Sequence, residues 1–295
     1  RPNVELAKAA GLEIGPSGTI AVNEHMQTSD PDIYAGGDCA ENTHMITGKK
    51  MFAAMGSTAN KHGRVIGENL CGANVRFRGI LGTGIVKLLD MSIGKTGLTE
   101  KEAKEAGFEY ITTMTTGNDR AHYMPDSRQI TIKLIADVKS RKLLGIQAFG
   151  EGEVAKRIDV VAALLTMGGT VDDLFDTDLS YAPPYNSPID NAAVAANALM
   201  NKIAGRFKGI SPLEAKEKMA SGKTVFLDVR TPDECKSVRL ADCQNVKYIP
   251  LGQLRDRMAE MGKDDEIVAF CKISLRGYEA ECMLEGEGFR DVKVI

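Results

Sequence analysis

The sequence has 295 residues, 43% of them hydrophobic, with 37 Lys and Arg against 40 Asp and Glu. This length and composition suit two or three folded domains and exclude a disordered or fibrous chain. A net charge of −3 without a long basic run argues against nucleic acid as a partner. No apolar run approaches the ~20 residues of a membrane-spanning helix. We therefore expect a cytoplasmic protein without a membrane partner.

Cysteine and histidine spacing predicts no metal site. None of the six cysteines forms a C-x-x-C pair, and the four histidines show no ligand spacing. A thiol that takes part in chemistry here would act alone. The first residues already read as the interior of a fold, which indicates a piece of a longer chain.

The chain divides into three predicted parts. In residues 1–75, short apolar runs at 19–23 and 32–35 favour strands, and helical spacing predicts a long helix over 50–70. Residues 76–205 are predicted to be α+β, with strands at 85–89, 91–96, 110–116, 129–137 and 143–149 and helices at 99–106, 154–167 and 191–203. Residues 99 to 102 read as a capping box.

The last part, residues 206–295, alternates helix and strand after a linker at 205–211. Helices are expected at 212–220, 251–260 and 276–285, and strands at 224–229, 266–270 and 291–295. This alternation is typical of an α/β domain.

The clearest chemical signal is Cys271, which follows the apolar run 266–270 and precedes a helix that starts near Arg276. A cysteine in such a loop meets free backbone N–H groups and a helix N-terminus, which favour thiolate. The same amides suit a persulfide anion, and Arg276 or Lys272 could attract an anionic sulfur donor. The alternative is a buried structural cysteine.

The surrounding residues resemble a rhodanese domain. Asp228-Val-Arg230 with Glu234, the Ile-Pro-Leu turn at 249–251, and the C-x4-R-G loop match that family's motifs. The resemblance implies that Cys271 carries sulfane sulfur as a persulfide and that residues 272–276 form its cradle. It also implies a structural ion pair between Asp228 and Arg230. The sequence departs from the family by placing Ile273 and Ser274 where a loop glycine is common.

A second signal is the string from Thr28 to Asp38, which ends in Gly36-Gly37-Asp38. Glycines allow a ligand to approach the backbone, and the carboxylate can accept hydrogen bonds from a polyol; Gly-Asp alone is more often a turn. The whole string resembles the second flavin-binding motif of FAD-dependent pyridine-nucleotide disulfide oxidoreductases. The resemblance assigns Gly37 and Asp38 to FAD and places Met51, Phe52 and Ala53 at the flavin edge.

Residues between these signals resemble the dimerisation domain of the same family, in the branch that reduces CoA disulfides, persulfides and polysulfides. The corner from Tyr181 to Tyr185 carries this resemblance, which implies that Tyr181 reaches the flavin and reactive cysteine of a partner subunit. Tyr123, before Pro125, is a second candidate. Two tyrosines packed against prolines are the structural alternative.

The resemblance also places Asn60, Lys61 and Arg64 at coenzyme A, although such residues often form only a solvated helix face.

Together these resemblances predict a partial FAD-binding domain, an α+β dimerisation domain and an α/β rhodanese-like domain, in a homodimer. They imply an enzyme that uses FAD and NAD(P)H to reduce CoA persulfide, CoA disulfide or polysulfide, with sulfur delivered by Cys271. Thiosulfate is a further candidate donor. Two alternatives remain open: a non-catalytic rhodanese-like module on an oligomerisation platform, and an NADH oxidase or peroxidase of the same family.

Overall fold

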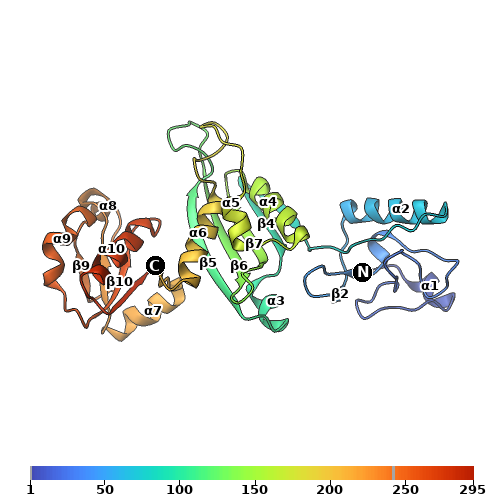
Figure 1. The fold of residues 1–295 in the computed structure, drawn as a ribbon, viewed down its shortest axis with the longest axis horizontal. Helices are drawn as coiled ribbons and strands as arrows, with labels where there is room; N and C mark the ends of the chain where they lie inside the picture. The colour runs from blue at the N-terminus through green and yellow to red at the C-terminus, as the bar shows by residue number, and fades with distance from the viewer. Residues whose placement is uncertain (1, 241–242) are drawn as a thin grey trace.

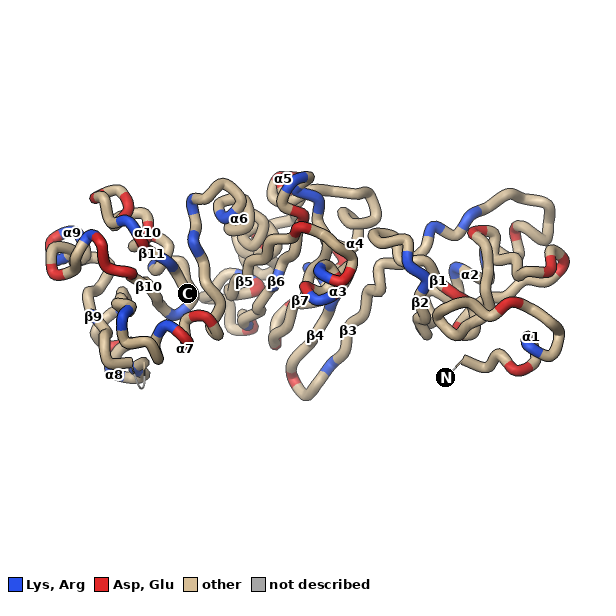
Figure 2. The backbone as a smooth tube through the Cα atoms, turned by 90° about the horizontal axis from the view of Figure 1, so that it is seen from below, with Lys and Arg blue, Asp and Glu red and all other residues tan. Residues whose placement is uncertain are grey.

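A computed structural model describes residues 2–240 and 243–295, which form three bodies along one long axis (Figure 1). An antiparallel sheet with its helices forms the middle body, and the N-terminal and C-terminal segments lie on either side of it. No described helix is long and apolar enough to cross a membrane. Lysines and arginines are interspersed with aspartates and glutamates along the whole tube (Figure 2).

The N-terminal body contains little regular structure besides one long helix. Its elements are α1 (Glu5–Ala9), a short 3-10 helix η1 (Gly37–Cys39), β1 (Asn42–Thr43), β2 (Lys50–Met51) and α2 (Gly56–Leu70). A small core that includes Ile20, Met26 and Val65 holds these elements together. The strands expected at 19–23 and 32–35 are wrong, because only Ile20 and Tyr34 form isolated bridges there. Ile20 bridges Ile14 and Ala40, and Tyr34 bridges Gln27, but no neighbouring residue extends these pairs into a strand.

Helix α2 is shorter than the sequence predicted. Lys50 and Met51 pair with Thr43 and Asn42 as an antiparallel hairpin, so the helix starts only at Gly56. Apolar residues at helical spacing before Gly56 therefore belong to a strand and a loop, a case in which strand pairing overrides periodicity.

The middle body is a five-stranded antiparallel sheet in the order β3-β4-β7-β6-β5. Its elements are β3 (Gly84–Leu88), β4 (Met91–Gly97), α3 (Glu100–Glu105), β5 (Tyr110–Asn118), β6 (Gln129–Asp137), β7 (Leu143–Gly150), α4 (Val154–Met167), α5 (Val171–Asp176) and α6 (Asn191–Ile203). The five predicted strands are confirmed, and so are α4 and α6. The Thr99 capping box is present, with Glu102 Oε2 accepting from the Thr99 N–H at 2.7 Å.

Helices α4 and α6 cover one face of this sheet, whereas the short helix α3 covers only one end of the other face, where Ala103 packs with Ile135. Alternate strand residues such as Ile132 and Ile146 pack against Ile158 of α4 and Leu199 of α6. On the opposite face, a row of paired residues runs through Val86, Ile93 and Phe149, which are 57%, 41% and 46% exposed. The chain by itself therefore leaves a short apolar row of this face exposed, next to polar residues such as Lys95 and Gln147.

The C-terminal body is a parallel four-stranded sheet in the order β11-β10-β8-β9, with helices on both faces. Its elements are α7 (Pro212–Ser221), β8 (Val225–Asp228), α8 (Pro232–Ser237), β9 (Val246–Tyr248), η2 (Leu251–Gln253), α9 (Leu254–Arg257), η3 (Met258–Glu260), β10 (Glu266–Phe270), α10 (Leu275–Gly286) and β11 (Asp291–Val294). The alternating α/β prediction is confirmed.

Two details of this body differ from the sequence prediction. The single helix expected at 251–260 is instead one turn of α-helix between two 3-10 turns. The predicted linker is also partly docked, because Ile210 N–H donates to Val294 O at 2.8 Å and Val294 N–H donates to Lys208 O at 3.2 Å. The linker thus continues the sheet beside β11.

Candidate functional site

Cys271 lies at the carboxyl end of β10, one of the two inner strands of the parallel sheet. The carboxyl ends of β8 and β10 meet at the same edge, which is where ligands bind in open parallel sheets. The thiol is partly exposed. Cys271 therefore occupies a position that a small reactant can reach.

The loop that follows Cys271 contains backbone N–H groups that are free to bind a ligand. Among the described residues, no hydrogen-bond acceptor is found for the N–H groups of Lys272, Ile273 and Ser274, which lie between Cys271 and the start of α10. Ser274 has a φ of 67°, the left-handed conformation that is uncommon for a non-glycine residue. It turns the chain into the twelve-residue helix α10, whose N-terminal dipole adds to the amides. This loop is suited to hold an anion.

Arg276 is fixed beside the loop by a carboxylate. Its two terminal nitrogens donate to Glu234 at 2.8 and 2.7 Å, and Glu234 also forms a capping box with Thr231. The guanidinium holds the pKa of Glu234 far below its ordinary range. The pKa of Arg276 is raised, first by Glu234 and also by the nearby Cys271. Arg276 therefore joins the α8 helix to the thiol.

Lys272 supplies a cation of a different kind. Its side chain is exposed, and no hydrogen-bond or ion-pair partner for it occurs in residues 2–240 and 243–295. Because its charge is not neutralised by a neighbour, Lys272 can attract an anion approaching Cys271.

The expected ion pair behind the loop is present. Arg230 donates to both carboxylate oxygens of Asp228, at 2.9 and 2.7 Å, and to Val238 O at 3.0 Å. Burial raises the pKa of Asp228, but hydrogen bonds from Arg230 and Cys235 outweigh it, so the pKa lies below its ordinary value. Burial raises the pKa of the Cys235 thiol. Cys235 is buried beside Asp228, whereas Cys271 is partly exposed.

In the N-terminal body, Gly36 and Gly37 bring η1 against helix α2. A Cβ on Gly36 would lie 2.9 Å from Ile66 Cδ1, and Gly37 has a φ of 76° that favours glycine. The Gly37 N–H donates to His62 Nδ1 at 3.1 Å. Burial lowers the pKa of His62, which favours the neutral ring that can accept this bond.

Asp38 is consequently presented to an open hollow of about 730 Å³ whose lining also includes Phe52 and Ala59. An exposed carboxylate beside two glycines fits a ligand with several hydroxyl groups, such as the ribityl chain of FAD. Met51 and Ala53 line a neighbouring pocket instead. The segment 51–55 thus separates two hollows. His62 was not identified from the sequence, although its helical spacing from the buried Thr58 marks it as facing inward.

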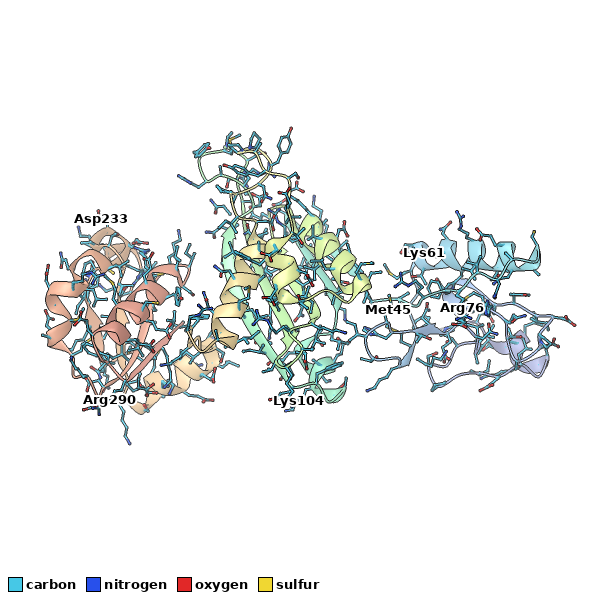
Figure 3. All side chains as sticks on the ribbon, in the orientation of Figure 1. Met45, Lys61, Arg76, Lys104, Asp233 and Arg290 are labelled. Carbon is cyan, nitrogen blue, oxygen red and sulfur yellow. The ribbon has the colours of Figure 1, made fainter. Side chains whose placement is uncertain are left out.

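The neighbouring pocket has a volume of about 740 Å³ and lies where the N-terminal and middle bodies meet. Figure 3 shows Lys61, Arg76 and Met45 at this junction. The lining includes several cations and no carboxylate: Lys61, Arg64, Arg76, Arg78 and Lys95. Arg64, Arg76 and Lys95 pair with nearby glutamates outside the lining, whereas no ion pair of Lys61 occurs among the described residues.

This basic pocket contains Lys61 and Arg64 but not Asn60. The Asn60 side chain donates to Gly56 O of its own helix at 2.8 Å. The pocket is therefore suited to a large anionic ligand, and Lys61 and Arg64 are the predicted residues that the structure places in it.

Tyr123 and Tyr181 lie on two loops that project from the middle body (Figure 1). They are 66% and 51% exposed. Ala121 N–H donates to Pro183 O at 3.3 Å, so the loops contact one another. Within one chain, the structure does not bring either tyrosine next to Asp38 or Cys271, because the three sets of residues belong to three different bodies.

No cluster of His, Cys, Asp and Glu that could hold a metal ion occurs in the described part of the chain. All six cysteines are free.

Family models match three consecutive segments. Residues 1–74 match the pyridine nucleotide-disulphide oxidoreductase model, residues 83–193 match the dimerisation domain of that family, and residues 211–295 match the rhodanese-like domain. The solved structure of an NAD-dependent persulfide reductase from A. fulgidus is 46% identical with a TM-score of 0.93, and the match covers 100% of this chain and 52% of that one.

Two further relatives agree. The structure of reduced CoADR-RHD from Bacillus anthracis is 36% identical with a TM-score of 0.92, again covering 100% of this chain and 52% of that one. The CoA-dependent NAD(P)H sulfur oxidoreductase of Pyrococcus furiosus is 46% identical over 199 residues, 68% of this chain and 45% of that protein. The chain thus spans about half the length of the relatives it matches. It belongs to the pyridine nucleotide-disulphide oxidoreductase family and ends in a rhodanese-like domain.

Proposed function

We propose that this chain is part of a flavin-dependent reductase that uses NAD(P)H to reduce CoA persulfide, CoA disulfide or polysulfide, and that Cys271 carries the sulfur. The observation that carries the proposal is the thiol loop: a partly exposed cysteine followed by three unpaired amides and a helix N-terminus. Such a loop stabilises negative charge on sulfur. The similarity to persulfide and sulfur reductases supports the choice of reaction.

The first step is sulfur transfer. The Cys271 thiolate attacks the outer sulfur of a persulfide or of thiosulfate, the S–S bond of the donor breaks, and a new S–S bond forms on Cys271. The leaving group departs as a thiolate or as sulfite, so no electrons are exchanged. The loop amides hold the charge of the resulting persulfide, and Lys272 draws in the anionic donor. Arg276 fixes the position of the loop relative to α8 through its two hydrogen bonds to Glu234.

The second step is reduction. A thiol acceptor takes the outer sulfur from Cys271, and two electrons and two protons then convert the acceptor persulfide into a thiolate and hydrogen sulfide. When FAD is bound, it supplies these electrons from NAD(P)H. Asp38 and Phe52 would hold it in this chain, because they line one hollow with room for hydroxyl-rich groups, and Gly37 would let it approach the backbone next to Asp38. Met51 and Ala53 line the basic pocket, and the segment 51–55 between the two hollows would bring them to the edge of the flavin.

Coenzyme A suits the basic pocket because its phosphates are anionic. Lys61 and Arg64 would bind them, with Arg76 and Lys95 on the same lining. Asn60 contributes less than the sequence implied, since its amide is used within α2.

The two sites lie on opposite sides of the middle body. The basic pocket is lined by Gly84 of β3 and Lys95 of β4, at one edge of the sheet, whereas Ile273 and Leu275 of the thiol loop adjoin Met114 of β5, at the other edge. Sulfur transfer to the flavin site therefore needs a diffusible or tethered thiol carrier, or a second subunit.

We propose a homodimer in which Tyr181, and with it Tyr123, reaches the partner's flavin site. The exposed apolar row of the sheet provides a surface for such an association, and a phenol near a thiolate can donate a hydrogen bond that stabilises its charge. Because all six cysteines are free, we place the protein in the reducing cytoplasm.

A sulfurtransferase assay with thiosulfate as donor and cyanide as acceptor tests the role of Cys271. We expect Cys271→Ser to abolish thiocyanate formation and Cys282→Ser, at an exposed thiol of the same body, to leave it unchanged. Equal rates for wild type and Cys271→Ser would refute the proposal and favour a non-catalytic rhodanese-like module.

A further inference from the structure

One buried side chain, that of Arg157, bonds both of the loops that carry the two tyrosines. Residues 119–128 carry Tyr123 and residues 177–190 carry Tyr181, and both tyrosine side chains are more than half exposed. An exposed side chain on a loop keeps a fixed direction only when its backbone is fixed. The contacts that fix these two backbones converge on Arg157.

Arg157 lies on α4 and is fully buried. Its Nη2 donates to Asp119 O at 2.8 Å, at the start of one loop, and to Asn186 Oδ1 at 2.9 Å, in the other loop. The same nitrogen lies 3.0 Å from an Asp190 carboxylate oxygen. Nη1 donates to Glu153 O at 3.0 Å. One guanidinium therefore connects both loops to the helix.

Each partner of Arg157 closes its own loop. Asp119 accepts from Arg128 N–H at 3.0 Å, across the base of the first loop. Asn186 donates to Ser180 O at 3.3 Å and accepts from Ser187 N–H at 2.9 Å, which fixes the segment next to Tyr181. Arg157 thus acts on the residue that sets the shape of each loop.

Packing alone does not require an arginine at this position. The other buried residues on this face of α4 are apolar, such as Ile158, Val161 and Leu165. A buried guanidinium is costly to desolvate, and an aliphatic side chain of similar volume fills space without that cost. What the arginine adds is a planar group whose Nη2 donates to both loops while its Nη1 bonds Glu153 O of its own helix.

We infer that Arg157 is a positioning residue that holds Tyr123 and Tyr181 in a fixed mutual arrangement, with both directed away from the middle body. The inference rests on the proposed function, because the tyrosines gain their importance from a role at the partner's flavin site. Arg157 itself touches neither tyrosine and is not a catalytic residue.

The test is fluorine NMR of the 295-residue chain labelled with 3-fluorotyrosine, with resonances assigned by single Tyr→Phe variants. We expect Arg157→Met to shift or broaden the Tyr123 and Tyr181 resonances together, while Tyr110 on β5 and Tyr248 in the C-terminal body stay in place. Arg157→Lys keeps the charge and a donor for each loop, but it lacks the second nitrogen that bonds Glu153 O and orients the group, so we expect it to restore the two resonances only in part.

Three variants keep the inference falsifiable should Arg157→Met fail to fold. Asn186→Ala removes the bond between Arg157 and the second loop, and it should shift the Tyr181 resonance more than the Tyr123 resonance. Arg120→Gln breaks ion pairs with Asp119, Asp126 and Glu153, none of which lies in the second loop, and should move the Tyr123 resonance alone. Arg141→Gln breaks a separate ion pair with Asp172 and should shift neither tyrosine resonance. Unchanged tyrosine resonances in folded Arg157→Met, or in Asn186→Ala, would overturn the inference.

A kinetic measurement separates this inference from the proposed function. In the full-length protein with FAD bound, we expect Arg157→Lys to lower kcat for CoA persulfide about 10-fold, with the KM for NAD(P)H unchanged, because small misplacements of catalytic groups cost up to about 10²-fold. If both resonances move but kcat does not change, the positioning role stands and the role of the tyrosines in the reaction is wrong.

Discussion

Glu281 provides a sharp test of how the C-terminal body holds together. Its side chain lies fully buried on α10, with Oε1 accepting from Lys208 N–H at 2.8 Å and Oε2 without a hydrogen-bond partner among the described residues. Burial raises the pKa of Glu281 to about 7 from an ordinary 4.5, and the nearby Glu285 raises it further, while Lys208 opposes the change. Tyr278 and Cys282 adjoin it on the same helix.

The raised pKa makes stability depend on pH in a defined direction. Below about pH 4.5 the carboxyl is protonated in both the folded and unfolded chain, so the folded state pays no penalty. Between pH 4.5 and 7 the unfolded chain releases its proton first, and stability falls. Above pH 7 the full cost remains, up to about 3 kcal/mol, because one pKa unit corresponds to about 1.4 kcal/mol.

Glu281→Gln mimics the protonated acid, since its carbonyl can still accept from Lys208. We expect it to raise the Tm of the transition that contains the C-terminal body at pH 8 by on the order of 10 °C, and to have little effect at pH 4.5, as measured by calorimetry. Glu260→Gln, which loses an ion pair with Arg257 elsewhere in the same body, is the control and should not stabilise. An equal gain at both pH values, or none at pH 8, would refute the assignment of a buried charged carboxylate.

Two further predictions concern ligand binding and assembly. Lys61→Gln should weaken CoA binding about 5-fold in calorimetric titration, and this loss of affinity should become smaller at high salt. Lys104→Gln, on α3 away from the pocket (Figure 3), is the control and should not weaken binding. Equal losses of affinity in the two variants would contradict the basic pocket as the CoA site. Ile93→Asp places a charge in the exposed apolar row of the sheet and should shift the chain from dimer to monomer in sedimentation, while Leu213→Asp, at an equally apolar exposed position on α7, should leave the dimer intact. A dimer that persists in Ile93→Asp would place the interface elsewhere.

Local sequence signals predicted most of the regular structure. The helices α4 and α6 and the strands of the middle sheet follow their hydrophobic periodicity, because each packs one face on a single core. The Thr99 capping box was readable since its two partners are three residues apart. In contrast, the hairpin at Lys50 that delays α2 depends on pairing with Thr43, and periodicity carries no information about such pairing.

Features that depend on distant partners could not be predicted in the same way. His62 supports Gly37 from 25 residues away. Arg157 bonds Asp119 and Asn186, which lie 38 and 29 residues from it in sequence. The thiol loop is an intermediate case: the position of Cys271 after a buried strand was readable, but the ion pair that fixes Arg276 to Glu234 spans 42 residues.

The most direct measurement of the central claim is mass spectrometry of the chain after incubation with thiosulfate. If the loop amides stabilise a sulfur-bound anion at Cys271, the peptide containing this residue gains the mass of one sulfur atom, and a reducing thiol removes it. Peptides containing Cys243 or Cys282 remain unmodified. Sulfur spread equally over the partly and fully exposed cysteines, or absent from Cys271, would contradict the account.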